Sequence, residues 1–350
     1  MIESASVESE HRIATDISLI ISDYRFGIVK QRTTTDVLDF VNSINEICDW
    51  MTSNDRRYFL KGLRTALTNS YWSANRIKMY MRPLLQMSGI DQNNEWVMLS
   101  LQESKSSQSR LVQEIDSRKG LLISSTFLET HDSYIYVDDA SYTGRTLAKY
   151  LIRIGDELSM LSKKTRKLVV WHLTEYSSET YKQISESLLL LNNLKVDVQF
   201  KRVEDLGNKT GEGKKLGTLL PTTACADSQI VQRYLKSRPP LIAMKDNPDL
   251  WRDPKADFID GLFASTDERH VVEKALLEVG CYLYLRTEQP KFRPLGYFAS
   301  TKDVSFGFGS MFCTCHNSAN TTPVAMWWGN PDLPKNSPLS LWRPLLPRIV

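Results

Sequence analysis

The chain has 350 residues, of which 41% are hydrophobic and 24% charged, and its formal net charge at pH 7 is +3. These values are typical of a globular protein with one large domain or two ordinary ones, and the small net charge does not indicate the concentrated basic face of a non-specific nucleic-acid binder. No apolar run reaches the roughly 18 residues of a membrane-spanning helix, and no secretory signal is evident, so we expect a cytoplasmic protein without a membrane partner.

The first part of the chain has a helical pattern. Apolar residues recur at steps of three and four from residue 34 to residue 88, beginning with Val37, Phe40, Val41 and Ile44. This spacing places them on one face of each helix. We therefore predict an N-terminal helical region over residues 1–92.

The middle of the chain alternates between two patterns. Short apolar runs at residues 96–101, 121–125, 134–137, 167–173 and 196–200 are typical of buried strands, and helical patterns lie between most of them. Strands that alternate with helices in this way predict an α/β fold, with a mainly parallel sheet flanked by helices. We assign this core to residues 93–250.

The last part of the chain is less regular. Residues 208–216 are rich in glycine and lysine and are predicted to form a surface loop, and residues 251–350 are predicted to form an irregular C-terminal extension packed on the core. The five cysteines are expected to be buried thiols. Cys313, Cys315 and His316 leave a metal site as an alternative, although structural zinc usually needs two spaced ligand pairs.

Residues 134–147 combine features of a phosphate-binding turn. They read Tyr-Ile-Tyr-Val-Asp-Asp-Ala-Ser-Tyr-Thr-Gly-Arg-Thr-Leu, so an apolar strand leads to Asp138 and Asp139, then to a turn containing Gly144, and then to an amphipathic helix. A parallel strand delivers its last residues to the sheet edge where α/β folds bind ligands. The amides and the positive dipole end of the following helix favour a phosphate.

Each part of this segment has a chemical interpretation. Gly144 would allow the backbone to approach a phosphate, and Thr143 and Thr146 would donate hydroxyls or cap the helix. The two carboxylates would accept hydrogen bonds from vicinal sugar hydroxyls or help to hold Mg²⁺. The alternative is an ordinary strand-to-helix turn with two solvated acids.

This segment resembles the signature of type I phosphoribosyltransferases, and its Tyr-Thr-Gly-Arg-Thr-Leu run is especially similar to that of bacterial pyrimidine-operon regulators with uracil phosphoribosyltransferase activity. The resemblance implies that Asp138 and Asp139 are the catalytic residues, contact the ribose 2′- and 3′-hydroxyls of phosphoribosyl pyrophosphate, and are candidate Mg²⁺ ligands. It also implies that the 5′-phosphate is held by Ala140, Ser141, Tyr142, Thr143, Gly144, Arg145 and Thr146.

In that family a loop after the first core strand binds pyrophosphate. The corresponding segment here is 101–110, where Lys105 and Ser106 are the candidate ligands. The segment differs from the usual loop because it contains no glycine. A polar loop that caps a helix is the alternative interpretation.

A second resemblance extends over most of the chain. Cys48-Asp49-Trp50, the turn at 134–147 and the segment Asn320–Trp328 resemble features of phosphoribosyltransferase-like effectors of bacterial conflict systems, including those associated with retrons. This implies an anti-phage effector, with a reverse transcriptase and its RNA–DNA product as candidate partners.

Three hypotheses follow for the function. The first is a phosphoribosyltransferase-like enzyme that acts on phosphoribosyl pyrophosphate or a nucleotide as a toxic defence effector. The second is a non-catalytic sensor or regulator that binds a nucleotide, and the third is a nucleobase salvage enzyme. Electrostatics and positioning supply much of the catalysis in such chemistry, so the lack of a Ser-His-Asp arrangement does not exclude an enzyme.

Overall fold

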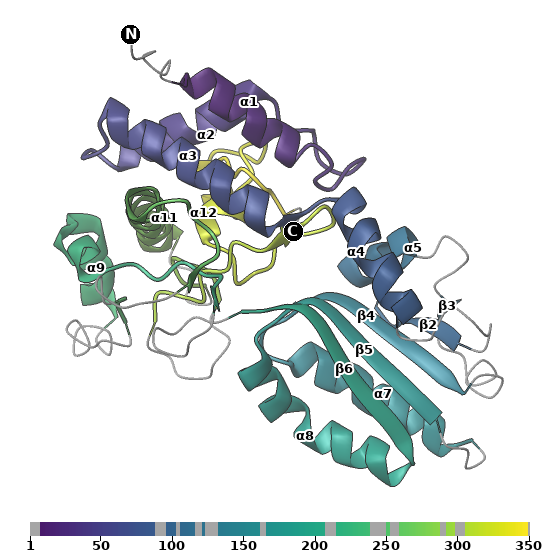
Figure 1. Ribbon diagram of the computed structural model, residues 1–350. Helices are drawn as coiled ribbons and strands as arrows, with labels where there is room; N and C mark the ends of the chain where they lie inside the picture. The colour runs from purple at the N-terminus through teal and green to yellow at the C-terminus, as the bar shows by residue number, and fades with distance from the viewer. Residues whose placement is uncertain are drawn as a thin grey trace. The chain divides into compact units, whose positions relative to one another are not determined.

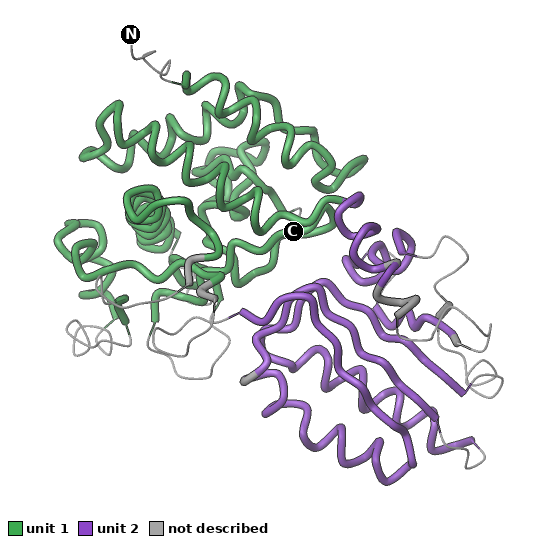
Figure 2. The backbone as a smooth tube through the Cα atoms, in the orientation of Figure 1, with its two compact units in different colours: residues 1–73, 207–350 green, residues 74–206 purple. Residues whose placement is uncertain are grey.

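The chain forms two compact units (Figure 2): residues 1–73 together with residues 207–350, called unit 1, and residues 74–206, called unit 2. The computed structural model describes residues 8–87, 96–102, 106–115, 121–122, 132–161, 166–206, 215–238, 250–252, 259–287, 292–297 and 305–348.

Unit 2 is an α/β unit built on a five-stranded parallel sheet (Figure 1). The strand order is β3-β2-β4-β5-β6, and every neighbouring pair is parallel. This confirms the predicted fold class. The strands are β2 (Trp96–Ser100), β3 (Leu121–Leu122), β4 (Ser133–Ser141), β5 (Arg166–Glu175) and β6 (Val196–Asp205), and the helices are α4 (Ala74–Met87), α5 (Ser107–Ile115), α7 (Arg145–Ser159) and α8 (Ser177–Asn193).

The central strands β4 and β5 are buried because helices cover the sheet. One face packs on α7 and α8, through side chains that alternate along the strands, such as Tyr134 and Tyr136, and that meet Leu147, Leu151 and Ile184. Because side chains on a strand point alternately to the two faces, a strand buried on both sides is almost continuously apolar. This explains the uninterrupted apolar runs of the sequence.

Unit 1 is mainly helical. Capping boxes at Thr33 and Thr52 begin α2 and α3. The threonine hydroxyl accepts a hydrogen bond from the backbone amide three residues later, and the aspartate at that position accepts one from the backbone amide of the threonine. Its elements are α1 (Glu10–Ile20), α2 (Thr34–Ile47), α3 (Ser53–Ser70), β1 (Tyr71–Trp72), β7 (Lys215–Leu216), η1 (Thr223–Asp227), α9 (Gln229–Ser237), β8 (Ile259–Asp260), α11 (Thr266–Thr287), β9 (Cys313–Thr314), α12 (Val324–Trp327) and η2 (Pro338–Leu341).

The two segments of unit 1 share one core. α11 packs against α2 and α3, and β1 pairs in parallel with β9, with Tyr71 opposite Cys313. The ring of Phe40 meets that of Trp342 at 5.8 Å between centroids. The observed boundaries therefore differ from the predicted ones at residues 92 and 250, because the apolar faces of the N-terminal helices are buried by the C-terminal part of the chain.

A buried group of charges lies along α11. Glu273 is fully buried, accepts a hydrogen bond from Arg252 at 3.0 Å and forms an ion pair with Arg269 at 2.9 Å, and both arginines are almost fully buried. The guanidinium of Arg252 also donates to the carbonyl of Leu220, and that of Arg269 to the carbonyl of Thr218. These bonds fix residues 218–220 against α11.

The cysteines of this unit were predicted to be buried thiols, and two of its tryptophans form hydrogen bonds inside it. All five cysteines are free and buried. Trp327 donates to the carbonyl of Thr322 at 2.8 Å, and Trp50 donates to the carboxylate of Glu278 at 2.8 Å. Both indoles therefore anchor packed segments. No helix in the described part of the chain is long and apolar enough to span a membrane.

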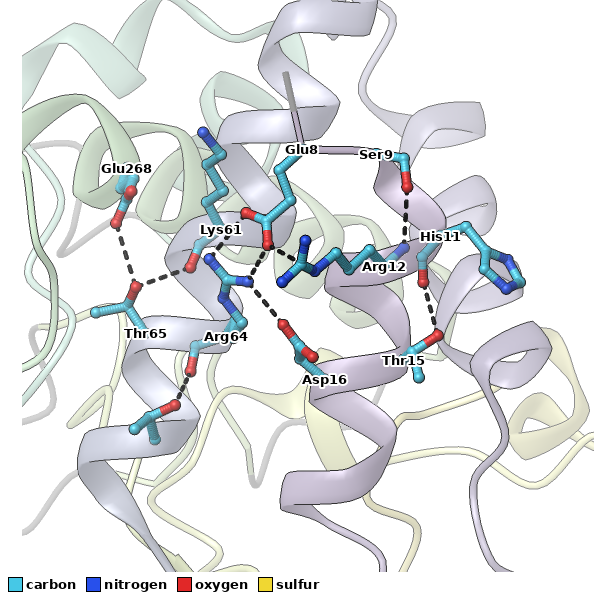
Figure 3. A network of polar contacts seen from close by, with 11 residues as sticks. Glu8, Ser9, His11, Arg12, Thr15, Asp16, Lys61, Arg64, Thr65 and Glu268 are labelled. Carbon is cyan, nitrogen blue, oxygen red and sulfur yellow. Dashed lines mark hydrogen bonds and ion pairs between the residues drawn. The ribbon is translucent and has the colours of Figure 1, made fainter. Parts of the chain in front are cut away.

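An ion network ties α1 to α3 within unit 1 (Figure 3). Arg64 on α3 lies 2.8 Å from Oε1 of Glu8 and 2.8 Å from Oδ2 of Asp16, and its second terminal nitrogen donates to Glu8 at 3.1 Å. The hydrogen bond from Arg64 lowers the pKa of Glu8. The ion pair between Arg64 and Glu8 therefore stabilises the fold at neutral pH, and this contribution is lost as the pH falls through the lowered pKa of Glu8.

We predict that Arg64→Met lowers the free energy of unfolding of unit 1 by about 1 kcal/mol. Arg64 binds Glu8 through both terminal nitrogens and also contacts Asp16, so it should contribute more stability than the median surface ion pair. Arg12→Met is the control: the Arg12 side chain is 76% exposed and lies 3.8 Å from Glu8, so its loss should change stability by less than about 0.5 kcal/mol. Urea unfolding followed by circular dichroism measures both values. Equal effects of the two substitutions would contradict this account.

Candidate functional site

The strand order of unit 2 contains a reversal. Going across the sheet, the strands are the second, first, third, fourth and fifth in chain order. The direction in which the chain adds strands therefore reverses between β2 and β4. The connections after these two strands leave in opposite directions, and such a point opens a crevice outside the carboxyl ends of the strands. Leu99 of β2 lies opposite Tyr136 of β4 near that edge. The loop after β2 and the turn after β4, which the sequence indicated separately, therefore lie at the same edge of the sheet, where such folds bind ligands.

β4 extends four residues further than predicted and includes both acids. Because successive side chains of a strand point to opposite faces, Asp138 and Asp139 diverge. Asp138 points to the side of Tyr136 and is 6% exposed. Its Oδ2 accepts hydrogen bonds from the hydroxyl of Tyr136 at 2.7 Å and from the amide of Gln102 at 2.9 Å, and its Oδ1 accepts one from the backbone of Asp139 at 2.9 Å.

Asp139 has a different environment. It is partly exposed, and the hydroxyl of Ser107, in the first turn of α5, donates a hydrogen bond to it. Asp139 is therefore more accessible to a ligand than Asp138, whose two oxygens already accept three bonds. The two carboxylates that the sequence treated alike have separate surroundings.

Both carboxylates resist ionisation. Burial raises the pKa of Asp138 well above its ordinary value, and the neighbouring charge of Asp139 raises it further. Burial also raises the pKa of Asp139, against hydrogen bonds that favour its charged form. A cation or a ligand hydroxyl placed at Asp139 would relieve this penalty, since it would stabilise the ionised form.

Gly144 begins α7 in a conformation that few residues adopt. Its φ is +70°, and a Cβ built there would lie 2.8 Å from the carbonyl oxygen of Thr180 and 2.9 Å from its Cα. The glycine is thus required for the close approach of the turn to α8. This packing requirement is a reason for the glycine that the sequence did not predict, and its role beside a phosphate stays a prediction.

The other turn residues divide by accessibility. Ser141 is buried, its hydroxyl lies 3.0 Å from that of Thr180, and it faces α8. Tyr142 is also buried, whereas Ala140 and Thr143 are partly exposed. Arg145 and Thr146, in the first turn of α7, are exposed.

The first turn of α7 has a positive electrostatic character. It contains no acid, and Arg145 adds a cation where the helix dipole is already positive. Such a residue is unfavourable for helix stability and favourable for an anionic ligand. The first helical amides have no partner within the helix and point to the same side. This combination fits the phosphate role predicted for residues 140–146.

The loop after β2 is partly described. Ser106 caps α5, because its hydroxyl accepts a bond from the backbone of Ser109 at 3.1 Å. The capping alternative is therefore what the structure shows for Ser106. Lys105, the other predicted pyrophosphate ligand, lies outside the described residues.

Several residues near the crevice had not been predicted. Gln102 and Tyr136 hold Asp138, and Ser107 holds Asp139. Tyr136 precedes Asp138 by two positions in a strand, so the two side chains lie on the same face of the sheet, and the sequence alone could have predicted their contact. Gln102 lies in the loop after β2 and Ser107 begins α5, and no local pattern in the sequence pairs either residue with the acids.

The neighbouring strand ends in a buried acid. Glu175 of β5 lies opposite Ser141 in the sheet register and is fully buried, and neither of its oxygens has a hydrogen-bond partner. The guanidinium of Arg202 lies 3.8 Å from Glu175 and is closer to Asp205, at 3.1 Å. Burial raises the pKa of Glu175 to about 7. His172, opposite Asp138, has a pKa that burial lowers to about 3, so it is neutral.

Comparison with known proteins identifies a family. A model of the PRTase-CE family, a phosphoribosyltransferase-type family, matches residues 42–348. No curated protein and no solved structure matches the chain.

We predict that Gly144→Ala destabilises unit 2 by about 1–3 kcal/mol more than the strain of a left-handed residue alone, because the new methyl group meets backbone atoms of Thr180. Gly27→Ala in unit 1 is the matched control. Gly27 has a φ of +76°, but nothing lies within 4 Å of its added Cβ, so only the strain of about 1–2 kcal/mol is expected. Urea unfolding of each variant is the measurement, and similar losses would disprove the packing explanation.

A second prediction concerns pH. The pKa of Glu175 is about 7 in the folded chain and 4.5 by the ordinary value, so the folded state keeps a proton that the unfolded state releases between these values. Stability should therefore fall as the pH rises through this window, by up to about 3 kcal/mol. Glu175→Gln should remove this loss when urea unfolding is compared at pH 5 and pH 8. Glu186→Gln, an exposed change on α8, should keep it. An unchanged pH slope in Glu175→Gln would count against the assignment.

Proposed function

This chain belongs to the PRTase-CE family, and we propose that unit 2 binds the 5-phosphate and ribose of phosphoribosyl pyrophosphate or of a nucleotide. The observation that carries the proposal is the convergence of two loops at the strand reversal between β2 and β4. One provides the amide-rich, positively charged start of α7, and the other places Gln102 and Ser107 against the two acids. An anion site and a carboxylate are thus combined at the edge where α/β folds bind ligands.

The two acids have different roles in this proposal. Asp139 accepts hydrogen bonds from a ribose hydroxyl, because it is the more accessible carboxylate. Asp138 acts as a positioning residue, since its oxygens are bonded to Tyr136, Gln102 and its own neighbour. The sequence had given both acids the same role.

A magnesium ion fits the proposed site through Asp139. No group of three or more His, Cys, Asp or Glu side chains in the described residues is arranged to hold a metal. Mg²⁺ often binds through only one or two carboxylates, together with substrate phosphates and water. Such an ion would neutralise charge on the phosphates of the ligand. Asp139 would orient the sugar and share the ion, and Arg145 would attract the phosphate.

Two forms of activity remain open under this proposal. A phosphoribosyltransferase-like enzyme would break or form the bond at C1 of the ribose, and a sensor would bind the nucleotide without turnover. An effector role in anti-phage defence, with a reverse transcriptase and its RNA–DNA product as partners, stays a prediction from the resemblance. Two segments that carry that resemblance, around Trp50 and Trp327, pack inside unit 1. Nucleobase salvage is the remaining alternative.

We predict that Asp139→Asn weakens binding of ribose 5-phosphate and nucleoside 5′-monophosphates at least tenfold in isothermal titration calorimetry with Mg²⁺, while the fold is retained. The reason is the loss of a charged acceptor for sugar hydroxyls, whose hydrogen bonds are worth about 1.5–3 kcal/mol. Asp156→Asn, an exposed change on α7, is the control and should bind like the unmodified chain.

The same proteins should be incubated with labelled nucleotides and phosphoribosyl pyrophosphate. Release of base or pyrophosphate that Asp139→Asn abolishes would support an enzyme, whereas tight binding without turnover would support a sensor. An unmodified chain that binds none of these ligands would refute the proposed function.

A further inference from the structure

Gln108, the second residue of α5, has no exposed surface. A buried primary amide must find partners for both of its ends. Its nitrogen donates to the carbonyl of Leu99 at 2.7 Å. Its oxygen accepts hydrogen bonds from two successive backbone amides, those of Leu101 at 3.2 Å and Gln102 at 3.4 Å. The side chain therefore folds back over the end of β2.

These two amides occupy a distinctive place. They follow the last residue of β2, beyond the paired part of the strand, at the carboxyl edge of the sheet where the strand order reverses. Successive backbone amides that converge on one oxygen form the kind of concavity in which proteins bind anionic oxygens. Here the oxygen in that concavity belongs to the chain itself.

The neighbouring bonds hold the arrangement in place. The carbonyl of Gln102 accepts a bond from the hydroxyl of Ser109 at 3.3 Å, and its side chain donates to Asp138 at 2.9 Å. Ser109 also lies 3.0 Å from the hydroxyl of Ser100. Gln102 is thus fixed through its amide, its carbonyl and its side chain. An anion arriving at these amides would have to displace Gln108 and leave a buried amide group without partners.

We propose that Gln108 fills the anion position at the end of β2, and that the crevice therefore takes a sugar 5-monophosphate in preference to a sugar that also carries a diphosphate on C1. The proposal rests on the proposed function, because it assumes that the turn after β4 binds the 5-phosphate. The favoured ligand class is ribose 5-phosphate or a nucleoside 5′-monophosphate. Gln108 is then a specificity-determining residue that contacts no ligand itself.

The test compares three probes by isothermal titration calorimetry with Mg²⁺: ribose 5-phosphate, phosphoribosyl pyrophosphate and inorganic pyrophosphate. The unmodified full-length chain should bind ribose 5-phosphate at least as tightly as phosphoribosyl pyrophosphate, and should not bind inorganic pyrophosphate. Gln108→Ala and Gln108→Met both free the two amides, and the second keeps the side-chain volume. Either variant that remains folded by circular dichroism should bind inorganic pyrophosphate, and its affinity for phosphoribosyl pyrophosphate should rise at least tenfold.

Gln113→Ala, an exposed change on the same helix, is the control and should leave all three affinities unchanged. An unmodified chain that binds phosphoribosyl pyrophosphate tenfold more tightly than ribose 5-phosphate would overturn the inference while supporting the proposed function. A preference for ribose 5-phosphate that persists in folded Gln108 variants would overturn the assignment to Gln108. Failure to bind any sugar phosphate would instead overturn the proposed function on which the inference rests.

Discussion

The hydrogen bond from the amide of Gln102 to the carboxylate of Asp138 joins the two strands between which the chain reverses its progress across the sheet. Breaking a hydrogen bond to a buried polar group leaves that group without a partner, which costs about 1–3 kcal/mol. Here the hydrogen bond connects the loop after β2 to the last part of strand β4. Asp138 and the adjoining backbone are thereby held in one arrangement, and Asp139 and the start of α7 are placed by the same strand. The site therefore depends on an acid that is itself largely enclosed.

The strand–helix alternation of unit 2 was readable from the sequence because its signals are local. Each strand is an apolar run and each helix an amphipathic one, and the predicted α/β fold is confirmed. The end of β4 was not readable. Two adjacent acids are typical of a turn, but Tyr136 and Gln102 satisfy Asp138 inside the sheet, so the strand continues to Ser141. That compensation comes partly from a loop about 36 residues earlier, which no local pattern reveals.

Gly144 shows the same difference between a motif and its physical cause. The sequence predicted that the turn before α7 needs a glycine, and the φ of Gly144 is positive there. The sequence suggested the approach of a phosphate as the reason, and the structure adds a second one, since Thr180 of α8 occupies the space of a side chain. The accessible and electropositive part of the turn is instead formed by Arg145 and Thr146. A residue type can thus be anticipated when its contact, which depends on tertiary structure, cannot.

The division of unit 1 into two distant segments has a consequence for its synthesis. The apolar faces of α2 and α3 are buried against α11, which begins at Thr266, so the ribosome must add about 200 residues before these helices meet their partner. Domains tend to fold as units during translation. The intervening unit 2 is complete by Leu206 and can fold first, while the early helices wait with exposed apolar surface. Nascent chains released before α11 emerges should therefore be clients of chaperones, or of proteases.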